Sequence, residues 1–167
     1  MKRIIATFSV MVLVFALSIS LASAKANFSG TWVMDASKSE GIPNSVQQEM
    51  TVVQTDDTIK LETKVKTDEG DFAIADSYVV NGKEVDFVPQ TPQGPNGKGK
   101  RTAKWTADGN GIEVTEQATF DTPDGQLNQQ MTRKWTLSAD GKSLVIELSA
   151  KGPDGTTNTK RLFTKKS

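Results

Sequence analysis

From Ala26 onward, apolar and polar side chains alternate along most of the chain, and short turn signals interrupt the alternation repeatedly. A period of two is typical of β-strands with one buried and one solvated face. The Asp-Gly and Asn-Gly pairs that favour tight hairpin turns stand at 81–82, 108–109, 124–125, 140–141 and 154–155. The pattern predicts consecutive antiparallel hairpins with about eight to ten strands, and it predicts no long amphipathic helix.

An antiparallel sheet of this size has two edges to protect, and closure into a ring removes both. The predicted fold is therefore all-β, an antiparallel up-and-down β-barrel, and a β-sandwich is the alternative. A repeated pair of hairpins supports the barrel, because TAKWT at 102–106 returns as TRKWT at 132–136. Two long segments, 35–47 and 89–100, are expected to be solvated connectors or the rim of a binding site.

The first 24 residues have the organisation of an export signal. Lys2 and Arg3 precede an apolar run over 4–21, and Ala22-Ser23-Ala24 provides a small-x-small cleavage site. An uncleaved membrane anchor is the alternative, since the run approaches spanning length. We predict a signal peptide at 1–24, a single mature domain at 25–167, and an exported protein that is periplasmic or secreted.

The composition excludes several kinds of chemistry. The chain has no cysteine and no histidine, so thiol nucleophiles, histidine-dependent triads and zinc-type sites are ruled out. No metal or other cofactor is expected, and the carboxylates of 67–71 fit a charged hairpin tip better than a calcium loop. The mature chain would keep 18 of the 20 basic residues and all 20 acidic ones, a net charge of about −2. No nucleic-acid partner and no membrane span in the mature chain are indicated, and the oligomeric state is open.

Several charged residues fall on the apolar side of the alternation. Asp76 lies in register with Ile74 and Tyr78. Arg133 lies in register with Trp135. A buried charge is costly unless it is paired or solvated. Either these side chains reach solvent at strand ends or bulges, or they line a cavity with an apolar wall and a basic end. The candidate ligand-binding residues are Arg133, Arg101, Arg161, Tyr78, Trp105, Trp135, Glu116 and Asp76.

The first predicted strand begins with FSGTW, which places Phe28, Gly30, Thr31 and Trp32 together. This start resembles the Gly-x-Trp signature of lipocalins and the opening of the intracellular fatty-acid-binding proteins, both calycins. The longer FSGTWVMDASKSEG, with SADGKSLVIEL at 138–148, is similar to exported bacterial lipocalin-like proteins. The resemblance implies a ligand-holding barrel in which Trp32 plugs the closed end. It also implies an arginine from the last strand over that tryptophan, for which Arg161 is the matching residue.

Three functions are compatible with these observations. The first is a carrier of a small hydrophobic or amphipathic ligand, with an anionic head near Arg133 and with Arg101 or Arg161 assisting. Its tail would lie among Trp105, Trp135, Ile112 and Ile146. The second is a non-catalytic envelope or interaction module whose barrel is filled by its own side chains. An enzyme that uses Asp76 or Glu116 as acid or base is the third, and we expect no catalytic activity.

Overall fold

The computed structural model describes residues 25–123 and 125–166, so the predicted leader lies outside the described residues. No helix in these ranges is long and apolar enough to cross a membrane. The elements, in chain order, are β1 (Gly30–Met34), the 3-10 turn η1 (Ala36–Lys38), β2 (Gln47–Thr55), β3 (Thr58–Thr67), β4 (Gly70–Val79), β5 (Glu84–Phe87), β6 (Gln90–Thr91), β7 (Gly94–Pro95), β8 (Lys98–Trp105), β9 (Gly111–Thr122), β10 (Gly125–Leu137), β11 (Ser143–Gly152) and β12 (Gly155–Lys165).

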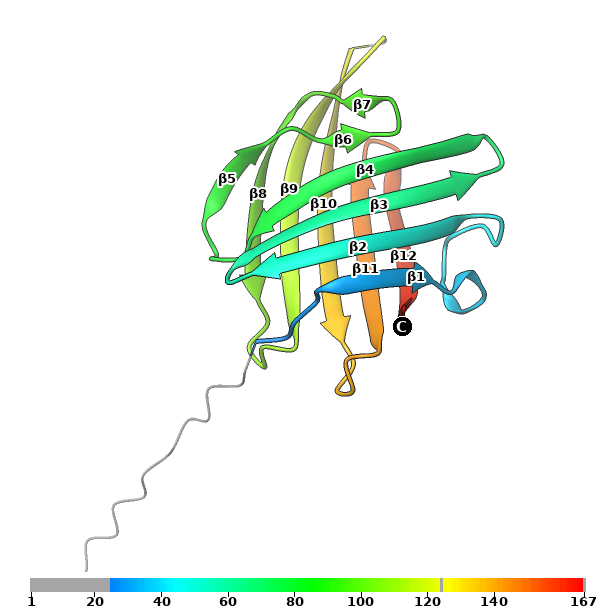
Figure 1. The fold of residues 1–167 in the computed structure, drawn as a ribbon. Coiled ribbons are helices and arrows are strands. Elements are labelled where there is room, and N and C mark those ends of the chain that lie inside the picture. The colour runs from blue at the N-terminus through cyan, green and yellow to red at the C-terminus, as the bar shows by residue number, and fades with distance from the viewer. Residues whose placement is uncertain (1–24, 124, 167) are drawn as a thin grey trace, which may run out of the picture.

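Ten of these strands form one continuous antiparallel sheet in the order β4-β3-β2-β1-β12-β11-β10-β9-β8-β5. The sheet curls on itself, so that β1 to β4 pass in front of β8 to β12 and cross them at a steep angle (Figure 1). The two edge strands, β4 and β5, are consecutive in the chain but are not hydrogen-bonded to each other in the described structure. The all-β barrel prediction is confirmed, with one seam between β4 and β5 that backbone hydrogen bonds do not close.

Aromatic side chains fill the end of the barrel at which the chain enters β1. Phe28 stacks on Trp105 with ring centroids 6.1 Å apart. Trp135 meets Phe28 edge-on at 5.7 Å and meets Tyr78 edge-on at 5.9 Å. Such offset and edge-to-face contacts add to the gain from burying the rings. This end, which we call the closed end, is therefore packed with the chain's own side chains.

Trp32 lies in the closed end and is fully buried. Its indole Nε1 donates a hydrogen bond of 2.8 Å to the Phe28 carbonyl oxygen. The cation over its ring is Lys165, with Nζ 5.2 Å from the ring centroid. Gly30 makes room for this lysine, since a Cβ at Gly30 would lie only 2.6 Å from the Lys165 Cε atom. The expectation that Arg161 covers Trp32 is therefore wrong, because the register of β1 and β12 places Lys165 opposite Trp32.

The opposite end of the barrel, which we call the mouth, is bordered by the two long segments that interrupt the alternation. The 35–46 segment holds η1 and joins β1 to β2. The 89–100 segment is partly ordered as the β6–β7 hairpin, seen above β4 in Figure 1. Asn96 anchors this hairpin, because its side-chain amide exchanges two 3.0 Å hydrogen bonds with the backbone of Asp121. Both segments are thus placed to form the rim of a cavity.

Candidate functional site

Arg101 of β8 is the centre of a buried polar cluster at the seam. Its Nη1 and Nη2 donate to the two carboxylate oxygens of Asp76 on β4 at 2.7 and 2.8 Å. Its Nε donates to Glu116 Oε1 at 2.6 Å. Nη1 also donates to the Ser77 carbonyl oxygen at 2.8 Å. The guanidinium group therefore ties β4 to β8 where backbone pairing is missing.

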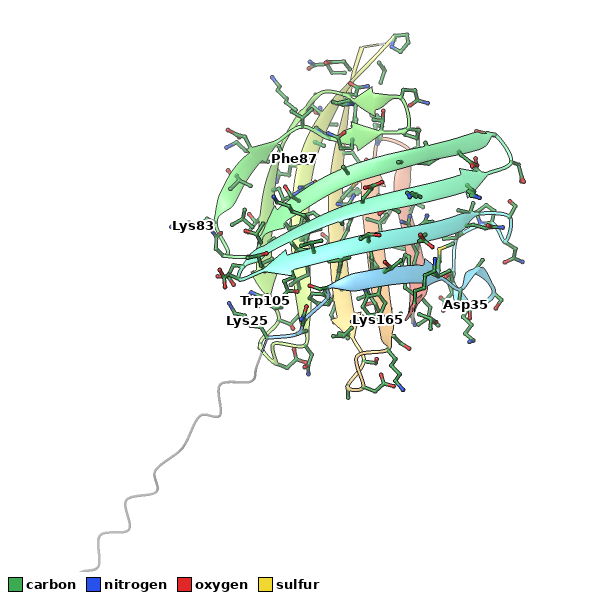
Figure 2. The ribbon with its side chains drawn as sticks, in the orientation of Figure 1. Lys25, Asp35, Lys83, Phe87, Trp105 and Lys165 are labelled. Carbon is green, nitrogen blue, oxygen red and sulfur yellow. The ribbon has the colours of Figure 1, made fainter. Side chains whose placement is uncertain are left out.

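The same guanidinium group is held between two aromatic rings. The Arg101 Cζ atom lies 4.7 Å from the ring centroid of Tyr78 and 4.0 Å from that of Phe87. Phe87 ends β5 on the far side of the seam (Figure 2). Only 5% of the arginine side chain is exposed, and cation–π contacts are strongest when the cation is desolvated. Side chains from β4, β5 and β8 therefore pack together across the seam.

Strand register explains why these charges meet. Arg101 and Glu116 are direct cross-strand partners in the β8–β9 pair. Arg133 on β10 stands opposite Val114, one inward position from Glu116, and its Nη1 donates to the second carboxylate oxygen of Glu116. Asp76, Arg101, Glu116 and Arg133 therefore form a chain of alternating charge whose formal sum is zero.

Burial and pairing act in opposite directions on the Arg101 pKa. Burial lowers it, but the Asp76 hydrogen bond and the charges of Glu116 and Asp76 outweigh burial and raise it above the ordinary value. Burial is also the main reason that the Tyr78 pKa is raised, so that its hydroxyl stays protonated far into the alkaline range. At neutral pH the Arg101 guanidinium is therefore charged, with a neutral phenol beside it.

A cavity of about 250 Å³ lies inside the barrel between the aromatic cluster and the mouth. Its walls are largely apolar, and Pro92 from the β6–β7 connection lies at its edge. The lining residues are Gln48, Met50, Leu61, Thr63, Val65, Phe72, Ile74, Asp76, Tyr78, Pro92, Arg133, Trp135, Ile146, Leu148, Arg161 and Phe163. Most of them occupy the inward positions of β2, β3, β4, β10, β11 and β12.

Arg161 contributes a charge that the described residues do not balance. No carboxylate of residues 25–123 or 125–166 forms an ion pair with it, and its buried Nε has no hydrogen-bond partner. Burial, followed by the positive charge of Arg133, lowers the Arg161 pKa from its ordinary value. An arginine nevertheless stays protonated in proteins, so this side of the cavity carries a net positive charge.

Further polar atoms inside the barrel lack partners. Gln48 Oε1 and Trp135 Nε1, both from cavity-lining residues, are buried and make no hydrogen bond within the described structure. Buried polar groups in proteins are nearly always hydrogen-bonded, so a group of unpartnered ones calls for an explanation. A bound polar ligand would provide partners for them.

The structure divides the candidate residues named from the sequence into two groups. Asp76, Tyr78, Arg133, Trp135 and Arg161 line the cavity, together with the expected tail contact Ile146. The others, Arg101, Glu116, Trp105 and Ile112, do not line it.

Each of the residues outside the cavity has a different environment. Arg101 and Glu116 belong to the seam cluster. Ile112 is fully buried in the core. Trp105 lies near Lys25 at the closed end (Figure 2), where its indole Nε1 donates to Asp57 at 3.2 Å.

Gln48 is a cavity-lining residue that the sequence reasoning missed. The alternation could have identified it, because Gln48 is in register with Met50 and Val52. Among the described residues there is no group of three or more carboxylates that could hold a metal ion.

Comparison with known proteins shows likeness at the level of the fold. No protein-family model matches the chain, and no curated protein matches it significantly. The zebrafish ileal bile acid-binding protein, in complex with cholic acid, is similar with a TM-score of 0.52 and 20% sequence identity over 83% of this chain and 98% of that one. Secretory abundant heat soluble protein 4 from Ramazzottius varieornatus aligns with a TM-score of 0.47 and 12% identity over 84% and 95%. The chain therefore shares its β-barrel fold with the zebrafish protein.

Proposed function

We propose that this chain is an exported carrier that holds a small amphipathic anion in the cavity, with the anionic group at Arg161. The observation that carries the proposal is the partly buried Arg161, whose buried Nε lacks a hydrogen-bond partner and which has no described carboxylate in ion-pair range. Charge-assisted hydrogen bonds from arginine to a carboxylate are strong in desolvated sites. The apolar remainder of the lining suits a hydrocarbon tail.

The distribution of charge favours Arg161 over Arg133 as the main ligand contact. Arg133 already donates to Glu116, whose side chain is 1% exposed, and it belongs to the neutral four-residue chain of the seam. An anion beside Arg133 would have to compete with that carboxylate. An anion beside Arg161 would instead balance a charge that has no described counter-ion.

The fold likeness is compatible with this proposal. The similar zebrafish protein is a bile acid-binding protein in complex with cholic acid. We extend only the general idea of hydrophobic-ligand binding to this chain, and its own cavity and unpartnered donors support that extension. The alternative function is a module whose barrel is filled by its own side chains. Such filling is found at the closed end, where four aromatic side chains pack together.

The enzyme hypothesis has weaker support. The carboxylates first considered as acid or base are Asp76 and Glu116, and both accept hydrogen bonds from Arg101. Carboxylate oxygens that already accept these hydrogen bonds are not free to exchange a proton with a substrate. Binding without chemistry is therefore the function that we propose.

Replacing Arg161 by glutamine should weaken binding of an amphipathic anion. Loss of one charge-assisted contact costs about 1.5–3 kcal/mol, which corresponds to about 10- to 150-fold in Kd. Isothermal titration with octanoate measures this change, and titration with octanol should show little difference between the variant and the parent. Lys160→Gln is the matched control, because it removes the same charge from the exposed face of the same strand.

Two results would contradict the binding proposal. One is that no amphipathic anion binds the parent protein. The other is that Lys160→Gln weakens octanoate binding as much as Arg161→Gln does. Circular dichroism of both variants would establish that the barrel is intact before the affinities are compared.

Export is the second part of the proposal, and it rests on the Ala22-Ser23-Ala24 site. Intact-mass measurement of protein recovered from the extracytoplasmic fraction of its source should give a chain that begins at Lys25. A mass that retains Met1 would show that the leader is not removed at this site.

A further inference from the structure

The interior cavity is small for a lipid-carrying barrel. Its volume of about 250 Å³ lies below the range of roughly 300–1,000 Å³ that is usual for drug-sized ligands. One water molecule takes about 30 Å³ in the liquid, so the cavity has room for roughly eight water-sized groups. A methylene group needs similar space. This volume sets the amount of ligand that can be buried.

The cavity ends at Trp135 on the side of the closed end. Trp135 lines the cavity and is 1% exposed. Edge-on contacts with Phe28 and Tyr78, at 5.7 and 5.9 Å, fix its ring. Protein interiors are close-packed and a ring held on two sides does not yield cheaply. A ligand tail therefore cannot pass Trp135 toward the closed end.

The seam blocks a second route along which a ligand tail could extend. Arg101 and its partners Asp76 and Glu116 lie at the β4, β8 and β9 wall, held by hydrogen bonds of 2.6–2.8 Å. An apolar chain that displaced these groups would leave buried charges unpaired, at a cost of several kcal/mol. A longer tail must therefore leave through the mouth, past Pro92, toward the charged residues of the β3–β4 turn at 67–71. This polar rim gives its additional methylenes little apolar surface to bury.

We propose that the cavity selects compact amphipathic monoanions with chains of about eight to ten carbons, and that Trp135 sets this limit. This inference rests on the proposed binding function and adds the ligand class. The anionic group binds Arg161. Gln48 Oε1 and Trp135 Nε1, which have no hydrogen-bond partner in the described structure, line the same cavity and can bind further polar atoms of the ligand. Long-chain fatty acids and rigid molecules as large as cholic acid exceed the space.

Titration of the parent protein with butanoate, hexanoate, octanoate, decanoate, dodecanoate, hexadecanoate and cholate, below their micelle concentrations, tests the limit. Each buried methylene should improve the Kd by about fourfold up to octanoate or decanoate. Beyond decanoate we expect a plateau, and we expect cholate to bind at least tenfold more weakly than octanoate. A Kd that keeps improving through hexadecanoate, or a tighter complex with cholate than with octanoate, would overturn the inference.

Replacing Trp135 by leucine tests the role of the tryptophan itself. The smaller side chain should deepen the cavity and move the plateau to chains two to four carbons longer. Trp105→Leu is the matched control, since Trp105 carries the equivalent position of the internal repeat but does not line the cavity, and its plateau should not move. An equal shift of the plateau in both variants would contradict the inference that Trp135 sets the length limit.

The results separate the two proposals. If no anion of any length binds, the proposed function itself fails. If anions bind through Arg161 but the affinity follows chain length without a limit, only the size inference fails. Should Trp135→Leu fail to fold, the length series with the parent protein still decides whether the limit exists.

Discussion

Replacing Arg101 by methionine should lower the free energy of unfolding by about 3–5 kcal/mol, because removal of one partner leaves buried charges uncompensated. Asp76 would lose both of its hydrogen bonds from Arg101, and Glu116 would keep only Arg133. The seam would also lose its bridge between β4 and β8. Urea unfolding followed by tryptophan fluorescence measures the change.

Lys100→Met is the matched control for Arg101→Met. Lys100 precedes Arg101 in β8 and forms an ion pair with Glu84 in which both side chains are more than half exposed. Exposed ion pairs contribute little to stability, so this variant should unfold close to the parent protein. Arg101→Lys should be intermediate, since an ammonium group keeps the charge but cannot bind a carboxylate with two parallel bonds. Equal stability of Arg101→Met and the parent would show that the seam cluster is not stabilising.

Replacing Trp32 by alanine should destabilise the protein by about 3–5 kcal/mol, as expected when a large buried aromatic is truncated. The variant loses a fully buried ring, the hydrogen bond from Nε1 to the Phe28 carbonyl oxygen and the surface on which Lys165 lies. Thermal unfolding should show a clearly lower Tm.

Val33→Ala provides the comparison for Trp32→Ala. Val33 is the next residue in β1, and its side chain is 40% exposed on the outer face. Its truncation should cost less than about 1 kcal/mol, as is usual for surface substitutions. A Tm for Trp32→Ala within two degrees of the parent would contradict the assignment of Trp32 as the plug of the closed end.

The alternation of the sequence was sufficient to predict the inward face of most strands. Asp76, Glu116 and Arg133 all point to the interior side, as their register with apolar neighbours indicated. The reason is that a strand without a bulge has a strict side-chain period of two. This rule places the charges on the inward side, but it does not decide between solvated strand ends and an apolar cavity with basic groups.

The partners of those charges could not be predicted in the same way. Whether Glu116 meets Arg101, Arg133 or both depends on the stagger between strands, which one strand's pattern does not specify. The seam depends on which two consecutive strands fail to pair. The Asn81-Gly82 pair in the β4–β5 turn favours a hairpin, so the expectation of pairing at this turn is wrong. The same limit explains the error over Trp32, because Arg161 and Lys165 both lie on β12 and only the register decides between them.

The position of Phe28 determines which way the barrel faces when it is attached to something through its N-terminus. Phe28 is fully buried in the closed end, and the segment from Lys25 to Phe28 runs along that end. The first residues of the described chain therefore lie on the side opposite the mouth. An N-terminal tether would hold the barrel with its entrance directed away from the supporting surface and open to ligands in the surrounding solution.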